Sequence, residues 1–514
     1  MKKIPLLLFS YLTAYTVFAQ EPADALRYSW LVPGGTARQQ AIGGAMGSLG
    51  GDISATFVNP AGLAFYKTGD FVLSPAYRFG KNKSTYLNRT DRESDKNFLL
   101  GTSGFVIGSG RQGRGFNNVA FSLAFNHTGD FNSDILYRGF NNQSSYSQKF
   151  LEEINNQNLK DANQVAQDFP LGTSLAFNTY WIDTIAGGSS GNYQFQSRAA
   201  NILSTGLLQQ QTIKNRGGVN EFALGGAINF NDKLMIGGTL GIPLLKYERD
   251  ATFIEADATE NTDNKFNSAS FTENLETTGV GVNLRAGLIY KPQEYWRLGL
   301  AIHSPTFYSL TDKYNYTVET DTEGYQGVQK QSTQDITGTG SEFKYMLFTP
   351  YKVIGSISYV IREIQDVTKQ KGFLTADVEY VNYKASTFEA DEENGTDQST
   401  EDYFSSLNKA IDNAYKSALN FRVGGELKFT TIMVRAGAAY YGNPYQNING
   451  EKGRKLNLSG GLGYRNKGMF VDLTYVHAMN KDVHFPYRLQ SSPYFGANVK
   501  STVGNIFLTL GTKF

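Results

Sequence analysis

The chain has 514 residues, with 54 Gly, 31 Tyr, 35 Phe, no Cys and a formal net charge of +1. The lack of Cys excludes disulfides, thiolate metal sites and a lipid-modified N-terminal cysteine, and the near-neutral charge argues against nucleic acid as a partner. Mean hydropathy is −0.36, and no later run approaches the roughly 18 apolar residues of a spanning helix. A helical membrane bundle is therefore excluded, but a β-barrel is not.

The first 19 residues have the pattern of an export signal. Lys2 and Lys3 precede an apolar run, and Val17-Phe18-Ala19 is a small-x-small type of cleavage site. We expect residues 1–19 to be a signal peptide and the mature chain to begin at or near Gln20. A membrane anchor is the alternative, but the run is too short for a confident span.

Residues 20–67 are rich in Gly and moderately apolar, which is not the composition of a solvated tail. They contain the tetrapeptide Asn59-Pro60-Ala61-Gly62. Pro60 has no backbone N–H and a fixed φ, while Gly62 permits close approach of another backbone, so the motif suits a segment wedged against a wall. An ordinary turn before the first strand is the alternative.

Fourteen later segments alternate apolar residues with polar or small ones. This period of two is typical of strands with one face toward lipid and the other toward a lumen, and the even number fits a single-chain barrel. The predicted strands are approximately 69–80, 95–109, 116–129, 218–231, 233–249, 274–291, 294–309, 342–361, 371–388, 415–429, 431–441, 454–466, 468–480 and 501–514.

The links between these strands alternate in length. After even-numbered strands they are short, as at Asn231-Asp232, Pro292-Gln293, Thr430 and Lys467. After odd-numbered strands they are long and polar. Short turns on one side and long loops on the other are typical of outer-membrane barrels, with the short side periplasmic. The long links include 130–217, 250–273, 310–341, 389–414 and 481–500.

The two faces of each predicted strand can be assigned from the cost of burying charge in lipid. In 274–291, Val280, Val282 and Leu284 share one face and Arg285 lies on the other. Because a charge facing lipid at mid-depth costs about 2–4 kcal/mol, the charged faces must point inward. The lumen then carries both signs of charge, which suits packing against a polar plug better than an ion-selective pore.

A lumen of fourteen strands is too wide for its own side chains to fill, since about eight strands is the limit. Residues 20–67 are available to plug it. The last predicted strand ends on Phe514, an aromatic residue that the barrel assembly machinery is expected to read. We therefore predict an all-β fold, a 14-stranded antiparallel transmembrane β-barrel over 68–514 plugged by an N-terminal hatch over 20–67, with short helices in extracellular loops.

Several of these segments resemble the FadL family of outer-membrane long-chain fatty-acid and hydrocarbon transporters. The resemblance spans the mature chain, although the long loops, above all 130–217, match nothing in the family. It rests on Ala37-Arg38, residues 41–45 and 51–63, which are similar to that family's hatch with Asn59-Pro60-Ala61 as its Asn-Pro-Ala motif, and on residues 279–292, 297–305 and Phe348-Thr349-Pro350.

The resemblance implies a barrel without a continuous water channel. An amphipathic ligand is caught by the extracellular loops, moves to a pocket inside and leaves through a gap in the wall when the hatch shifts. In this family the gap arises where the third strand is kinked beside the Asn-Pro-Ala motif. The candidates here are Phe125, Asn126 and His127, because His127 interrupts the apolar face of the third predicted strand.

Two loop segments have helical spacing of apolar residues. Phe150, Leu151 and Ile154 form one such set, and Leu407 and Ile411 belong to another. Packing of each helix on the barrel rim is the simpler interpretation. The functional interpretation is an apolar groove at the outer surface, where the alkyl chain of a ligand first lands.

The remaining motifs do not indicate catalysis. Residues 108–113 match the GxGxxG spacing of nucleotide sites, but a strand follows them where that site requires a helix. The four His residues are scattered without a catalytic neighbourhood, and the acidic run 389–402 fits a solvated loop better than a calcium loop. We expect no catalytic residue, no metal site and no cofactor, so the protein is predicted not to be an enzyme.

The predicted function is passive transport of hydrophobic or amphipathic small molecules across the outer membrane of a Gram-negative bacterium. The expected partners are that ligand, outer-membrane lipids and the barrel assembly machinery, and the protein is expected to be a monomer. Two alternatives remain open. A general diffusion porin conflicts with the plug-like N-terminal segment, and a surface receptor or adhesin would use the long loops alone.

Overall fold

The computed structural model describes residues 22–110, 117–185, 187–188, 191–259, 261–338, 341–361, 371–391, 398–446 and 453–514. The predicted signal peptide, most of the short link after the second predicted strand, and the middle of the acidic run lie outside the described residues.

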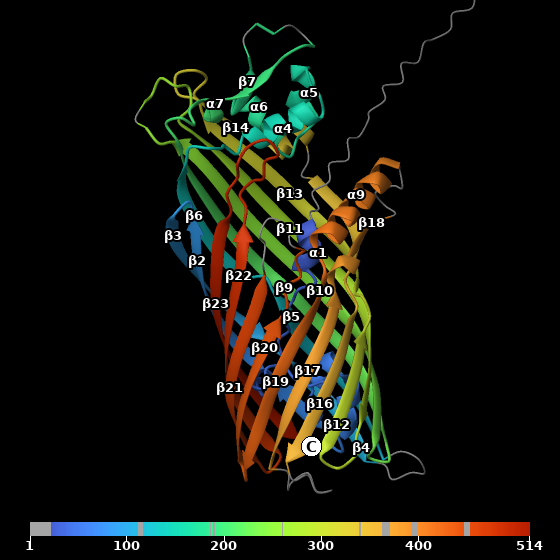
Figure 1. The fold of residues 1–514 in the computed structure, drawn as a ribbon. Coiled ribbons are helices and arrows are strands. Elements are labelled where there is room, and N and C mark those ends of the chain that lie inside the picture. The colour runs from blue at the N-terminus through green and yellow to red at the C-terminus, as the bar shows by residue number, and fades with distance from the viewer. Residues whose placement is uncertain are drawn as a thin grey trace, which may run out of the picture.

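The described strands form a closed antiparallel barrel of fourteen staves, each stave being the strand or pair of strands that crosses the wall once (Figure 1). The predicted number of strands is confirmed. In chain order the staves are β1 (Asp70–Leu73) with β2 (Pro75–Tyr86); β3 (Arg89–Leu100) with β4 (Ser103–Gly110); β5 (Asn118–Asp130) with β6 (Ser133–Asn141); β9 (Leu207–Phe230); β10 (Leu234–Asp257); β11 (Ser268–Tyr290); β12 (Trp296–His303) with β13 (Phe307–Asp321); β15 (Ser341–Phe348) with β16 (Lys352–Ile361); β17 (Gly372–Asn382) with β18 (Thr387–Ala390); β19 (Ser417–Phe429); β20 (Ile432–Tyr441); β21 (Arg454–Asn466); β22 (Met469–His484); and β23 (Ala497–Lys513).

Pairing of the first stave with the fourteenth closes the barrel. Leu73 of β1 lies opposite Leu510 of β23, and Ala76 of β2 lies opposite Phe507. The end of the barrel that carries the short turns is called the lower end below. Its turn at Asn231-Asp232 has both residues at positive φ, 51° and 55°, which matches the twist of the strands that it joins.

Several strands are longer at the upper end than predicted. The loop expected between the first two strands does not exist, because β2 and β3 continue to a two-residue turn at Leu87-Asn88, with φ of 44° and 66°. Staves 4 to 7 also rise further than expected. Above the apolar band their outward residues become polar, and the apolar residues that remain lie on the buried face, such as Tyr247 and Phe253 in β10. The alternation of the lower part is therefore not continued, although the ladder is.

The exposed and buried faces follow the predicted alternation. Leu284 is 58% exposed and Val423 54%, whereas Asn420 on the opposite face is 1% exposed. The apolar band ends where the outward residues become charged, between Leu244 and Lys246 in β10. This belt of exposed apolar side chains is the lipid-facing surface of a transmembrane barrel.

Helices occur in the upper loops, as expected. The loop between staves 3 and 4 folds into a cap with a two-stranded sheet, and a longer helix follows stave 9 (Figure 1). None of the helices in the described part of the chain is long and apolar enough to cross a membrane. These elements are α4 (Gln148–Asn156), α5 (Ala162–Gln167), α6 (Thr173–Asn178), β7 (Ile182–Thr184), β8 (Phe195–Ser197), α7 (Arg198–Asn201), β14 (Val328–Ser332), α8 (Thr333–Thr337), the 3-10 turn η3 (Tyr383–Ala385) and α9 (Gln398–Ala414).

The N-terminal segment, defined as the described residues 22–67, lies inside the barrel (Figure 1). It contains α1 (Pro22–Arg27), α2 (Ala37–Ala41), α3 (Ala55–Val58) and the 3-10 helix η1 (Pro60–Phe65). Figure 1 shows α1 nearer the upper end and the later helices deeper in the lumen. Most of its residues are buried, although the segment has few regular elements of its own. The barrel wall therefore supplies most of its packing.

Candidate functional site: the luminal pocket and the N-terminal segment

Asn59 forms hydrogen bonds both with the barrel wall and with other residues of the N-terminal segment. Its side chain is fully buried, and its Nδ2 donates to the carbonyl oxygens of Gly47 at 2.5 Å and Leu288 at 3.2 Å. Its Oδ1 accepts the amide of Ala61 at 3.1 Å, which caps η1, and Pro60 occupies the first turn where no N–H is needed. The tetrapeptide thus joins two turns of the segment to stave 6.

Two glycines of the wall make room for this motif. A Cβ at Gly287 would overlap Asn59 Oδ1, and one at Gly237 would overlap the backbone of Pro60. Both glycines lie on strands that were predicted, but the sequence offered no sign that they meet the motif. A contact of this kind depends on register and on where the segment lies, so pattern analysis of one sequence does not find it.

Hydroxyl and carboxylate groups on the wall hold the rest of the segment. Asp377 Oδ2 accepts the amide of Gly47 at 3.0 Å. The hydroxyl of Ser48 lies 2.5 Å from that of Ser358 on β16, and the hydroxyl of Thr56 lies 2.8 Å from that of Ser122 on β5. These contacts reach opposite sides of the lumen, so they fix the lower part of the segment across the barrel.

A cavity of about 1190 Å³ of empty space, part of it open to solvent, lies in the lumen beside the segment. Its N-terminal lining falls in two stretches, residues 28–34 after α1 and residues 39–58 around α2 and α3. Apolar side chains in its lining include Leu31, Phe57 and Val58 from the segment. The cavity is therefore bounded by two parts of the same N-terminal segment and by the wall between them.

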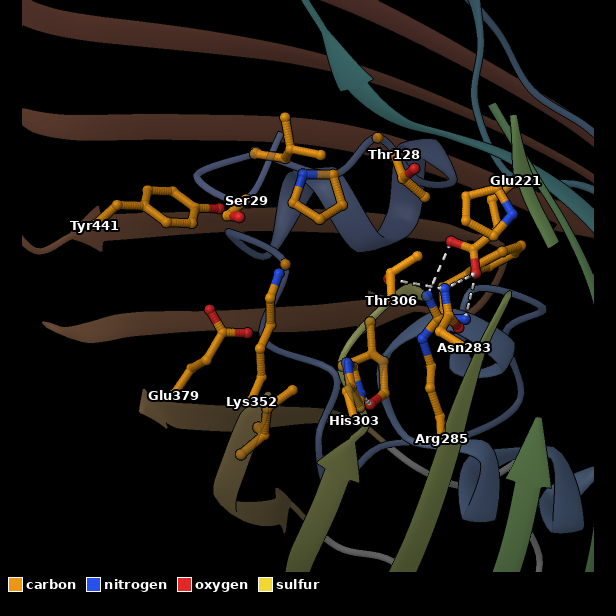
Figure 2. Close-up of a pocket in the computed structure, with 18 of the residues that line it drawn as sticks. Ser29, Thr128, Glu221, Asn283, Arg285, His303, Thr306, Lys352, Glu379 and Tyr441 are labelled. Atoms are coloured by element: carbon orange, nitrogen blue, oxygen red, sulfur yellow. Dashed lines mark hydrogen bonds and ion pairs between the residues drawn. The ribbon is translucent and has the colours of Figure 1, made fainter. Parts of the chain in front are cut away.

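The wall side of the cavity is charged (Figure 2). Arg285 pairs with Glu221 at 2.7 Å, and Arg422 pairs with Glu379 at 2.8 Å. Lys352 also lines the cavity and interacts electrostatically with Glu379, the acid that Arg422 already pairs. Two paired acids and three cations leave one excess positive charge in this part of the lining. The cavity is thus amphipathic and favours an anionic group near Lys352.

Stave 3 is irregular at the predicted wall-gap residues. The ladder of β5 with β9 shifts register between His127 and Gly129, and its ladder with β4 reaches no higher than Phe125 opposite Ser103. Above that level, no ladder within the described residues joins β3 to β6. Side-chain pairs bridge them instead, such as Arg138 with Asp91 at 2.6 Å.

The N-terminal segment fills the irregular part of stave 3. The amide of Gly34 donates to the carbonyl oxygen of His127 at 2.9 Å, and Asn126 Nδ2 donates to the carbonyl oxygen of Gly34 at 3.3 Å. Asn59, in contrast, bonds to staves 6 and 7 and not to β5. The structure therefore brings Asn126 and His127 to Gly34, a residue that the sequence did not single out, rather than to the Asn-Pro-Ala motif, while Phe125 packs on Phe222 of β9.

The sequence matches no model of a known protein family, and no curated protein matches it. Solved structures do match. A FadL homologue from Pseudomonas aeruginosa aligns over 95% of this chain and 100% of its own, at 13% identity and a TM-score of 0.55. The toluene transporter TodX from P. putida aligns over 94% of this chain and 99% of its own, at 12% identity and a TM-score of 0.50. The chain has the FadL fold.

Within this FadL-type fold, the predicted loop residues occupy two separate buried clusters. Phe150 and Ile154 pack with Trp181 in the cap, and Leu151 lies partly buried beside them. Leu407 and Ile411 of α9 pack in another cluster, together with Leu26 and Tyr28 of the N-terminal segment. The hydroxyl of Tyr415, just after α9, donates to the carbonyl oxygen of Pro22 at 2.9 Å. These side chains hold the loops in place, and α9 holds α1.

Proposed function

We propose that the protein is an outer-membrane barrel through which hydrophobic or amphipathic small molecules pass without energy input, and that residues 20–67 act as a movable hatch. The fold supports this proposal, since one solved structure with the same fold is described as a toluene transporter. Outer-membrane lipids and the barrel assembly machinery are then the expected surroundings. No step of this proposal requires chemical catalysis.

The observation that carries the proposal is the position of the cavity between two stretches of the N-terminal segment. A ligand in the cavity meets residues 28–34 on one side and residues 39–58 on the other. Movement of the segment would therefore change access to the ligand. The bonds that hold the segment to the wall are separate contacts, most of them through side chains, rather than a continuous backbone ladder, which makes such a movement less costly than opening the barrel ladder.

The lining also suggests the finer class of ligand. The segment contributes apolar side chains, and the wall contributes Lys352, whose acidic neighbour Glu379 is already paired with Arg422. An amphipathic acid, such as a long-chain fatty acid, would place its carboxylate at Lys352 and its chain along Leu31, Phe57 and Val58. A pure hydrocarbon would not balance the excess positive charge of this lining, so we propose that acids are preferred.

A reversible cross-link between hatch and wall tests the proposal. Ser48 and Ser358 are both buried with their hydroxyls 2.5 Å apart, so Ser48→Cys with Ser358→Cys suits a disulfide. The chain has no other Cys. We expect oxidation to abolish protein-dependent uptake of radiolabelled oleate by cells, and reduction to restore it.

The matched control joins two residues of the wall. Ser358→Cys with Thr375→Cys uses hydroxyls 2.9 Å apart on β16 and β17, at the same place but without the hatch. Its oxidation should leave uptake unchanged. Normal uptake with the hatch locked would reject the hatch, and an uptake of oleate no greater than that of cells lacking the protein would leave the loop receptor ahead. A large steady ion conductance of the unmodified protein would favour a porin.

A further inference from the structure

The ladder between staves 7 and 8 is interrupted once and has the same register above and below the interruption. Below it, His303 lies opposite Lys352, the uppermost of eight successive pairs that begin with Trp296 and Tyr359. Above it, Phe307 lies opposite Phe348. The same register on both sides places Pro305 directly opposite Pro350. Two adjacent strands therefore present proline at the same level of the wall.

Opposed prolines remove the hydrogen-bond donors from both strands at one level. The bonds that remain in the interval are few. The amide of Thr349 donates to the carbonyl oxygen of Thr306 at 3.1 Å, and the amide of Thr306 donates to the side-chain hydroxyl of Thr349 at 2.9 Å. No ladder pair is formed by residues 304–306 with residues 349–351, all of which are described. At roughly 3.3 Å per residue, the weak stretch is about 10 Å long.

This weak stretch separates the cavity from the lipid. On the inner side, Thr306, Thr349 and Pro350 line the cavity, and Figure 2 shows Thr306 beside Asn283. On the outer side, Phe307 is 51% exposed and Tyr351 is 39% exposed, within the apolar band of the wall. The stretch with the fewest hydrogen bonds between staves 7 and 8 thus lies between the cavity on one side and the membrane on the other.

The N-terminal segment forms hydrogen bonds with the irregular part of stave 3 but not with this stretch. At stave 3, Gly34 bonds to His127 and occupies the irregular position. No hydrogen bond among the described residues joins the segment to residues 304–306 or 349–351. The segment does bond to stave 7 just below the stretch, where His303 Nε2 lies 2.8 Å from the carbonyl oxygen of Val58. An opening confined to residues 304–306 and 349–351 would therefore break no bond of the seated segment, whereas opening the wall at stave 3 would first require Gly34 to leave.

We propose that the proline-bearing stretch between staves 7 and 8 is a lateral opening, through which the apolar part of a ligand moves between the luminal cavity and the membrane. This inference rests on the proposed transport function and adds a route to it. Lys352, next to the stretch and in the cavity lining, would hold an anionic head group while the chain enters the lipid. The probe with the matching chemistry is an amphipathic acid.

Closing the stretch with a disulfide tests the opening. Phe307 and Phe348 are register partners whose rings lie 5.2 Å apart, so Phe307→Cys with Phe348→Cys can be cross-linked while both prolines stay. Oxidation should remove most protein-dependent oleate uptake, and reduction should restore it. The control, Leu298→Cys with Ile357→Cys, joins register partners lower in the same two staves and should show no difference between oxidised and reduced protein.

A second variant restores the missing donors without a cross-link. Pro305→Val with Pro350→Val allows the ladder to continue and should also lower uptake, whereas Pro75→Val in β2 should not. Unchanged uptake in the oxidised Phe307/Phe348 pair, with uptake still blocked by the Ser48–Ser358 lock, would overturn the opening and leave the transport proposal standing. A lack of protein-dependent uptake in the unmodified protein would overturn both.

Discussion

The wall between staves 4 and 5 and the wall between staves 7 and 8 have the same alternating pattern, yet only the first is paired throughout. Every residue of β9, from Leu207 to Phe230, has a partner in β10. This ladder includes Pro243, which lies opposite Glu221. On its other side, the ladder of β10 with β11 skips Ile242 and Pro243, so a single proline interrupts pairing with one neighbour only. The opposed prolines of staves 7 and 8 place both interruptions in the same seam, beside the cavity.

The largest effect is expected from removing the N-terminal segment, which separates what the wall does from what the hatch does. Deleting residues 20–65 should leave an assembled barrel, because its ladders close on themselves. The lumen should then conduct ions, measured in planar bilayers, and oleate uptake should fall. A deletion variant that assembles, conducts no more than the wild type and takes up oleate normally would contradict the hatch.

The position of the apolar band can be tested by placing Arg at two heights on the outer face of β11. Leu284→Arg places a charge in the apolar band and should reduce assembly, at a cost of about 2–4 kcal/mol. Asn274→Arg lies on the same face of β11 above the band, where Asn274 now bonds to Asp250, and should assemble normally. Folded protein in outer-membrane fractions measures the difference. Equal yields from both variants would mean that the upper limit of the band is misplaced.

Weakening the attachment of the hatch to the paired wall should have a moderate effect on oleate uptake. Asn59→Ala leaves the carbonyl oxygens of Gly47 and Leu288 without this donor, and a buried unsatisfied group costs about 1–3 kcal/mol. We expect slower oleate uptake without increased ion conductance, because the other contacts keep the segment seated. A conductance as high as that of the deletion variant would show instead that Asn59 alone seats the hatch.

The smallest effect is expected at stave 3. A Cβ at Gly34 would lie 2.7 Å from the carbonyl oxygen of His127, so Gly34→Ala should displace the segment from the wall, at a cost of about 1–3 kcal/mol. In Gly35→Ala, the new Cβ meets the end of the flexible Gln39 side chain, which can move aside. Protease sensitivity of the segment should rise only in the first variant. The same sensitivity in both would argue that Gly34 does not anchor the segment.

The sequence predicts the parts of this molecule that repeat with a fixed period. Alternation revealed the fourteen strands and their faces, because lipid on one side forces a period of two. It failed above the apolar band, as at Leu87-Asn88, where the ladder continues without an apolar face. The partners Gly287 and Asp377 follow from where the segment lies in the lumen, which no local pattern encodes. Helical spacing likewise identified apolar faces in α4 and α9 but not the neighbours that cover them.

One residue of the last strand, Thr509, contacts both the N-terminal segment and the first stave of the wall. The amide of Ala37 in the N-terminal segment donates to the hydroxyl of Thr509 on β23 at 2.7 Å, and the same hydroxyl lies 2.9 Å from that of Ser74. β23 is the strand that meets stave 1 when the barrel closes. The closing strand therefore holds both its neighbour in the wall and the chain inside, so we expect seating of the segment to depend on closure of the barrel, while closure does not depend on the segment.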